Sequence, residues 1–286
     1  MSKSKIGLTL GAAALVVLLF NMPKVVVDNK NNEVPAGHSA DDGHDHGNDA
    51  ENEQTAAVTH FQGRALSEIE SNQLAELKAS YENSTSEQEK ANFAISIAGI
   101  FNEVNQLDSA IYYAVVAAKQ MPELNYWLKA GNAYYQAFQF AADEKQQQNL
   151  GKEVRKWYGK VLEVDPNQLE AKTNIAMTYI PTSNPMQGIT MLREVLEVDP
   201  NNEAALFNMG ALSIQSGQYE RAIQRFEHLL SLYPENVQAH LLLGISYKET
   251  GNKKRAAEHF ETVKKLDNDP SVQAAADSYL EDLTNN

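Results

Sequence analysis

A seven-residue segment occurs twice in the chain without a single change. Val161–Asn167 reads VLEVDPN, and the same letters return at Val195–Asn201, an offset of 34 residues. Pro234 follows Pro200 after a further 34 residues. Self-similarity at a fixed period of this length indicates one supersecondary unit that is repeated, because such a unit must bury its apolar face against its neighbours. The first expectation for the fold is therefore a stack of short repeated units.

The segment 203–236 has the pattern of two helices joined by a turn. Gly217 stands where the first helix would end, since glycine adopts the left-handed conformation that closes many helices. Pro234 stands where the second would end, since proline cannot continue a helix. Small residues mark the crossing of the two helices and large apolar residues surround it: Gly210 and Ala222, then Leu206, Met209 and Phe226. Period and pattern together resemble the tetratricopeptide repeat, a helix-turn-helix unit of 34 residues.

The resemblance covers roughly residues 91–270. It divides this stretch into five units, with the bounds 91–123, 124–168, 169–202, 203–236 and 237–270. The second unit exceeds the period, and we interpret its surplus, around Phe138 to Gly151, as an extended helical turn rich in glutamine. In the third unit Gly188 stands where a small alanine is usual. Because stacked units need a polar-sided lid at each end, residues 63–90 and 271–286 are predicted to be capping helices.

The resemblance implies an all-α, right-handed superhelix, a solenoid whose first helices line a concave groove. Such a groove typically binds an extended peptide or a helix of a partner protein. Side chains one helical turn away from the packing seam should face the groove. The expected groove residues are Leu128, Asn132, Tyr135, Thr173, Asn174, Met177, Phe207, Asn208, Ala211, Leu241, Ile245 and Lys248.

Three asparagines run along this expected groove. They are Asn132, Asn174 and Asn208. An asparagine side chain offers both a donor and an acceptor, so a row of them could bind the backbone of an extended peptide whatever its sequence. The alternative is that they simply face water. The neighbouring apolar side chains would either form pockets for the peptide or pack within and between units: Phe207, Leu241 and Ile245.

Some members of the family hold a partner's terminal carboxylate with several basic residues and two asparagines. Asn132 and Asn174 match those asparagines. However, Leu128, Ala204 and Asn208 stand where the basic residues would be. An apolar or mixed peptide is therefore the better expectation for the ligand.

The amino terminus carries a segment expected to enter a membrane. Lys3 and Lys5 precede an uncharged run from Ile6 to Phe20, slightly shorter than the roughly 17 to 25 residues of a spanning helix. Because the small residues that signal peptidase needs are missing after the run, residues 1–22 are predicted to be an uncleaved anchor. The expected location is the bacterial inner membrane, with one span and the repeats facing the periplasm. The alternative is a cleaved signal peptide and a soluble periplasmic protein.

Residues 23–62 are rich in Asn, Asp, Gly, Glu and His, which predicts a flexible, self-repelling linker. His38, His44 and His46 lie near carboxylates, and such a set could bind zinc, copper or nickel. Binding would have to order the linker at a cost in conformational entropy. A solvated linker is therefore the preferred interpretation, and no metal site is predicted.

Composition and spacing exclude several functional classes. The chain has no cysteine, which excludes thiol nucleophiles, disulfides and cysteine-based zinc sites. Its formal net charge of -14 disfavours nucleic acid as a partner. His228, His240 and His259 are scattered, and no nucleophile, base and orienting carboxylate share a recognisable spacing. We therefore expect neither catalysis nor a cofactor but a scaffold that holds another protein; the alternative is a structural protein that forms a homo-oligomer.

Overall fold

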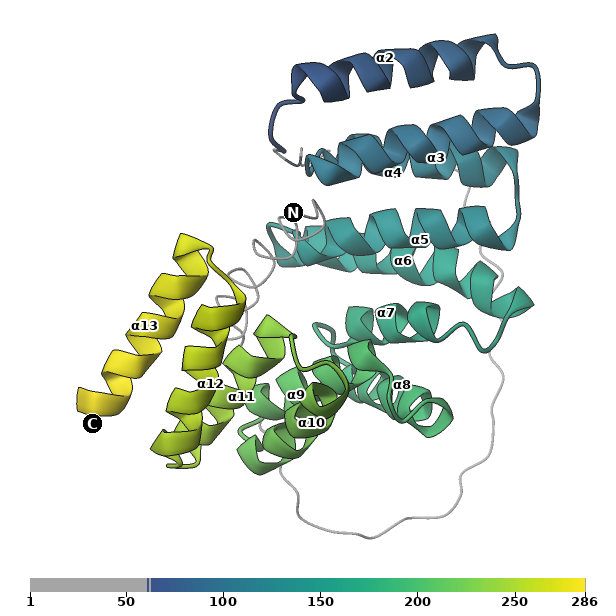
Figure 1. Ribbon diagram of the computed structural model, residues 1–286. Helices are drawn as coiled ribbons and strands as arrows, with labels where there is room; N and C mark the ends of the chain where they lie inside the picture. Colours follow the sequence, from purple (N-terminus) through teal and green to yellow (C-terminus); the bar gives the residue numbers. More distant parts are fainter. Residues whose placement is uncertain (1–60, 62, 286) are drawn as a thin grey trace, which may run out of the picture.

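The computed structural model describes residues 61 and 63–285, and within them every element of regular secondary structure is an α-helix (Figure 1). The all-α prediction is confirmed for this part of the chain. The helices are α2 Glu68–Asn83, α3 Glu87–Glu103, α4 Leu107–Gln120, α5 Leu124–Gln139, α6 Glu144–Val164, α7 Leu169–Tyr179, α8 Pro185–Val198, α9 Glu203–Gln215, α10 Tyr219–Leu232, α11 Val237–Glu249, α12 Lys253–Leu266 and α13 Pro270–Asn285.

The helices stack in sequence order, each against the next, into a curved solenoid (Figure 1). The pairs α3–α4, α5–α6, α7–α8, α9–α10 and α11–α12 form the repeating units. The first helices also contact one another, α3 with α5, α5 with α7, α7 with α9 and α9 with α11. Among the described residues, consecutive second helices show no contact of that extent. Since helices on the inner side of a curve approach most closely, the first helices form the inner wall.

In three of the units a glycine of the first helix faces a buried aromatic ring of the second helix. A methyl group added to any of these glycines would lie 2.6 to 2.7 Å from the ring of the second helix. The predicted role of small residues at the crossing is thereby explained: the ring fills the space that a side chain would need. The three contacts are Gly131 with Tyr158, Gly210 with Phe226, and Gly244 with Phe260.

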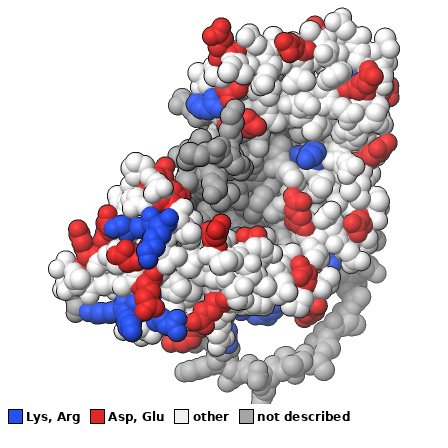
Figure 2. All heavy atoms as spheres, in the orientation of Figure 1, with Lys and Arg blue, Asp and Glu red and all other residues white. Residues whose placement is uncertain are grey.

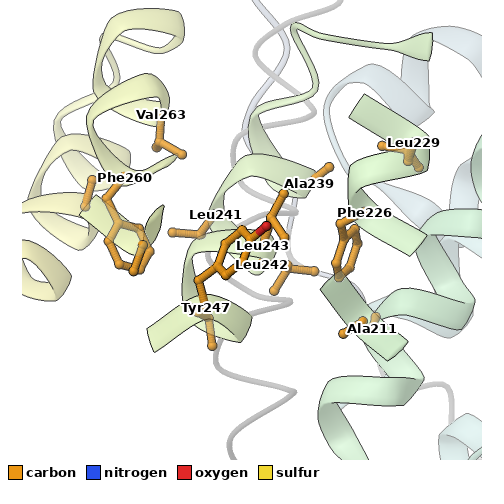
Figure 3. Packing of buried hydrophobic residues seen from close by; sticks show 14 of the residues in the cluster. Ala211, Phe226, Leu229, Ala239, Leu241, Leu242, Leu243, Tyr247, Phe260 and Val263 are labelled. Atoms are coloured by element: carbon orange, nitrogen blue, oxygen red, sulfur yellow. The ribbon is translucent and has the colours of Figure 1, made fainter. Parts of the chain in front are cut away.

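In the carboxyl-terminal part of the solenoid one apolar core cluster runs from α9 through to α13. Figure 3 shows α11 between the other helices, with Phe226 of α10 on one side and Phe260 of α12 on the other. Both rings are fully buried. Because residues of α9–α10, α11–α12 and α13 share this cluster, the neighbouring helix pairs stabilise each other, as expected for a stacked repeat.

The turns within the units differ in how they reverse the chain. Gly217 and Gly251 have φ angles of 70° and 81°, in the left-handed region that glycine adopts without strain. The prediction that Gly217 closes a first helix is confirmed. In the α3–α4 turn Asn105, with φ 57°, takes this role, which asparagine tolerates better than most residues.

The structure corrects two boundaries that the repeat pattern predicts. α3 begins at Glu87, before the expected start of the first unit at residue 91, so α2 alone forms the amino-terminal cap. The surplus of the second unit lies mainly in α6, which starts at Glu144 and is 21 residues long. The Asp143 carboxylate accepts a hydrogen bond from the Gln146 N–H at its start. Good helix formers after an N-cap extend the helix, so the surplus is not an extended turn.

Both ends of the solenoid are closed by polar contacts. At α2 the Ser67 and Glu70 side chains form a capping box. The Arg64 guanidinium bonds both Glu70 carboxylate oxygens, at 2.8 and 2.6 Å, and holds the pKa of that carboxyl well below its usual range. At the other end α13 packs on α12, and the Lys264 Nζ donates to Asp277 at 2.5 Å.

The predicted anchor 1–22 and all of the predicted linker 23–62 except Phe61 lie outside the described residues. The candidate metal ligands His38, His44 and His46 therefore lie outside as well. Over the described helices, none combines the length and apolar character that a membrane span requires. The same part of the chain holds no group of three or more potential metal ligands.

Candidate partner-binding surface

The predicted groove residues all belong to the first helices α5, α7, α9 and α11, which form the inner wall. Seven of them are partly exposed there, and we call these seven the inner-wall set: Leu128, Asn132, Tyr135, Asn174, Met177, Phe207 and Asn208. The other five are either buried or engaged by the carboxyl-terminal cap. The candidate surface therefore lies over α5, α7 and α9.

Leu241 and Ile245 do not form open pockets. Their exposed fractions are 6% and 4%, and both belong to the apolar cluster around α11. The alternative reading of the sequence, that they pack within or between units, holds in the structure. The physical reason is that α11 is enclosed on all sides from residue 241 to 247. Every residue of that stretch is buried, so the helix has no side there that faces solvent. Thr173 and Ala211 are buried too.

Lys248 lies at the end of the wall but faces the cap. Its Nζ donates to the Asp282 carboxylate at 2.6 Å and lies 5.5 Å from the centre of the Tyr279 ring. Both partners belong to α13. The predicted groove lysine is thus tied to the last helix.

Two of the three asparagines are joined by a tyrosine of a second helix. The Tyr158 hydroxyl donates to Asn132 Oδ1 at 2.7 Å and accepts from Asn174 Nδ2 at 2.8 Å. Asn132 Nδ2 in turn donates to Glu170 Oε1 at 3.0 Å. Burial raises the pKa of Tyr158, so its hydroxyl keeps the proton that it donates. Asn132 and Asn174 therefore do not simply face water: hydrogen bonds fix their orientation.

Partly exposed apolar groups flank this amide network. Tyr135 stacks on Phe138 with ring centres 6.0 Å apart, and burial raises the pKa of Tyr135 to about 12. Phe207 meets the Phe226 ring edge to face at 5.9 Å. Met177 packs against the core cluster of α7 to α9. The wall thus combines two fixed amides, on α5 and α7, with apolar side chains on α5, α7 and α9.

Charge is distributed unevenly over the face seen in Figure 2. Carboxylates are spread over all of this face, the carboxyl-terminal helices included, whereas the larger groups of Lys and Arg lie over the carboxyl-terminal helices. The inner-wall set itself contains no charged side chain. A ligand for the wall would therefore be recognised by hydrogen bonds and apolar contact.

Two of the scattered histidines meet in the structure. His240 Nδ1 and His259 Nδ1 lie 2.9 Å apart, and His240 Nε2 lies 2.9 Å from the Pro234 carbonyl oxygen. Since a carbonyl only accepts, His240 Nε2 carries the proton, and His259 Nδ1 donates to His240 Nδ1. Burial, followed by the neighbouring His240, lowers the pKa of His259 to about 4. The His259 ring stacks on Tyr247 at 5.7 Å, so the pair is part of the packing between α11 and α12.

Sequence reasoning missed Tyr158 as a functional candidate. The signal was present, because residue 158 lies two periods of 34 before Phe226 and three before Phe260. All three rings face the glycine of their own unit. Two other units have phenylalanine at this position, so packing does not require the hydroxyl of Tyr158.

Comparison with known families supports the repeat assignment for the carboxyl-terminal part of the chain. Two family models described as tetratricopeptide repeat match residues 191–224 and 213–277. Residues 191–277 are therefore similar in sequence to tetratricopeptide repeats. The matched stretch includes α9 to α12, whose turn glycines and ring-facing glycines are described above. The helix pairs before it continue the same stack without a break.

One solved tetratricopeptide-repeat structure shares the fold of this chain, and two more are similar to it over part of its length. A thermophilic TPR protein from Thermus thermophilus matches with a TM-score of 0.53 at 12% identity, over 66% of this chain and 98% of that one. The MamA 41-end structure from Desulfovibrio magneticus RS-1 gives 0.47 at 20% identity, over 63% and 97%. YrrB, described as a TPR protein with an unusual peptide-binding site, gives 0.42 at 19% identity, over 70% and 96%. No curated protein matches the sequence.

Proposed function

We propose that this protein is a non-catalytic, membrane-tethered adaptor that binds an extended peptide or a helix of a partner protein along its inner wall. One observation carries the proposal. Amide groups on α5 and α7, held by hydrogen bonds, stand beside partly exposed apolar side chains on α5, α7 and α9. Amides pair with a peptide backbone, and apolar groups take up its side chains.

The chemistry of the wall favours a peptide over a charged ligand. Leu128, Met177 and Phe207 offer apolar contact, and methionine adapts to side chains of different shape. Glu170 adds a carboxylate beside Asn132, which disfavours a negatively charged group at that place. An apolar or mixed segment of a protein fits both conditions.

The amino-terminal segments complete the proposal. The uncharged run within residues 1–22 would anchor the chain in the bacterial inner membrane, and residues 23–62 would link it to repeats in the periplasm. A flexible chain of about 40 residues has a root-mean-square span of roughly 35 Å. The repeats could then search for a partner close to the membrane surface. The alternative is a cleaved signal and a free periplasmic protein.

Paired substitutions in one unit test the wall as the binding surface. Phe207 is half-buried on the inner wall, whereas Leu232 is an exposed apolar residue at the end of a second helix. We expect Phe207→Asp to abolish capture of partner proteins from cells, and Leu232→Asp to leave it unchanged. Met177→Asp repeats the test in another helix pair. It keeps the test valid if Phe207→Asp unfolds the helix pair that contains Phe207. Unchanged capture by both wall variants would rule the wall out.

A row of exposed apolar residues favours self-assembly as a second candidate. Val164, Val198 and Leu232 stand at 34-residue spacing at the ends of successive second helices, with exposed fractions of 62%, 59% and 39%. An apolar row of this kind is one way in which copies of a protein associate. Light scattering on residues 61–286 distinguishes the two: an oligomer that Val198→Asp dissociates favours the structural role, and a monomer favours the adaptor.

A further inference from the structure

We propose that Tyr158 is a positioning residue for the partner site, because its hydroxyl turns Asn132 and Asn174 so that Asn174 presents its amide oxygen to an N–H group of a bound peptide. The inference rests on the proposed function and adds a preference to it. The preferred ligand is the interior of an extended segment, which offers backbone N–H groups. A terminal carboxylate, which offers only acceptors, is disfavoured.

The ring of Tyr158 is held rigidly. It is fully buried, and Gly131 of α5 lies so close that an added methyl group would stand 2.7 Å from two of its ring carbons. The ring therefore carries its hydroxyl to a fixed point between α5 and α7. At that point the hydroxyl meets one asparagine from each helix.

The hydrogen bonds fix which end of each amide is used. Asn132 Oδ1 accepts from Tyr158, and Asn132 Nδ2 donates to Glu170, so both ends of this amide are engaged. Asn174 donates its Nδ2 to Tyr158, which turns its Oδ1 away from the hydroxyl. Among the described residues no donor reaches that Oδ1. An amide oxygen held in place and lacking a protein donor is suited to accept a hydrogen bond from a ligand.

Two later units show that the hydroxyl is not needed for packing. Phe226 and Phe260 occupy the equivalent place against Gly210 and Gly244, and both rings are fully buried. A phenylalanine therefore fits this position in the same protein. The hydroxyl of Tyr158 is an addition whose visible effect is to orient the two asparagines.

The substitution Tyr158→Phe removes this hydroxyl and keeps the ring. A phenylalanine ring already occupies the equivalent place in two other units of the chain. In the full-length protein in detergent micelles, with ¹⁵N-labelled asparagine, we expect the side-chain NH₂ signals of Asn132 and Asn174 to shift and their exchange with water to quicken. Tyr134→Phe, which removes another half-buried hydroxyl from α5, is the matched control and should leave both signals in place. Unchanged signals in Tyr158→Phe would overturn the positioning role.

Retention of a random dodecapeptide library on the immobilised full-length protein tests the preference. The library is used in two forms, with a free carboxylate and with a carboxyl-terminal amide. We expect both forms to be retained alike, and Tyr158→Phe to reduce retention by about three- to tenfold, the loss of one oriented hydrogen bond. Stronger retention of the free-carboxylate form than of the amide form would contradict the inference. Equal retention by the wild type and by Tyr158→Phe would contradict it as well. If the wild type retains neither form, the proposed function fails, while the side-chain signals still decide the orientation.

Discussion

The carbonyl oxygen of Ala176 lies 2.3 Å from the point where a methyl group on Gly188 would stand. This relationship explains why the third unit has glycine at this position. The next two units have alanine at the equivalent positions, Ala222 and Ala256, at 34-residue spacing. Here α7 and α8 approach so closely that the obstacle is backbone, which cannot rotate away as a side chain could. The helix pair would have to separate to admit the methyl group.

Gly188→Ala should therefore destabilise the protein by about 1 to 3 kcal/mol, the usual cost of overpacking. Gly159→Ala is the matched control, because that glycine also lies within a helix but a methyl group there meets nothing within 4 Å. The control should gain roughly 0.5 to 1 kcal/mol from helix propensity. Urea unfolding of both variants measures the two effects, and equal free energies of unfolding would disprove the close approach.

Phe226→Ala should cost about 3 to 5 kcal/mol, because it empties a fully buried site against Gly210 and removes the edge contact with Phe207. In a stacked repeat the loss should be felt first by the adjoining helices α9 to α11. Hydrogen exchange followed by mass spectrometry should show faster exchange there than in α3 and α4. Tyr112→Ala, at an exposed position on α4, should change little. Uniform loss of protection along the chain would contradict the nearest-neighbour picture.

The His240–His259 contact predicts a loss of stability in acid. The pKa of His259 falls from 6.5 to about 4 in the folded protein, so between these values the unfolded chain binds the proton more readily. Its contribution is fully present above pH 6.5 and decreases as the pH falls toward 4. Arg255 acts in the same direction as burial and His240, whereas Glu227 and Glu258 oppose them.

His259→Gln should flatten this part of the stability profile, since an amide does not titrate. Thermal unfolding at pH 7, 6, 5 and 4 measures the slope. His228→Gln, on the exposed side of α10, serves as the control and should keep the wild-type slope. If the stability of His259→Gln changes with pH as steeply as that of the wild type, the acid sensitivity arises from other groups.

The repeat period was sufficient to predict the stacked helix pairs, because Gly217 and Pro234 mark helix ends through local backbone chemistry. The fate of the apolar groove residues was not predictable in this way. Leu241 has the spacing of a wall residue, but α11 is mostly apolar and buried on every side from residue 241 to 247, so periodicity does not show which side faces the core. The link between Asn132 and Asn174 depends on Tyr158 from another helix, and such contacts between helices leave no trace in local spacing.

Site-specific photo-crosslinking in living cells tests the central claim most directly. A photoreactive phenylalanine analogue replaces Met177 on the inner wall in one strain and Glu194, exposed on the second helix α8, in another. We predict a discrete adduct with a partner protein from position 177, reduced in the Phe207→Asp background, and none from position 194. An adduct from position 194 alone, or crosslinks from position 177 only to a second copy of this chain, would contradict the account.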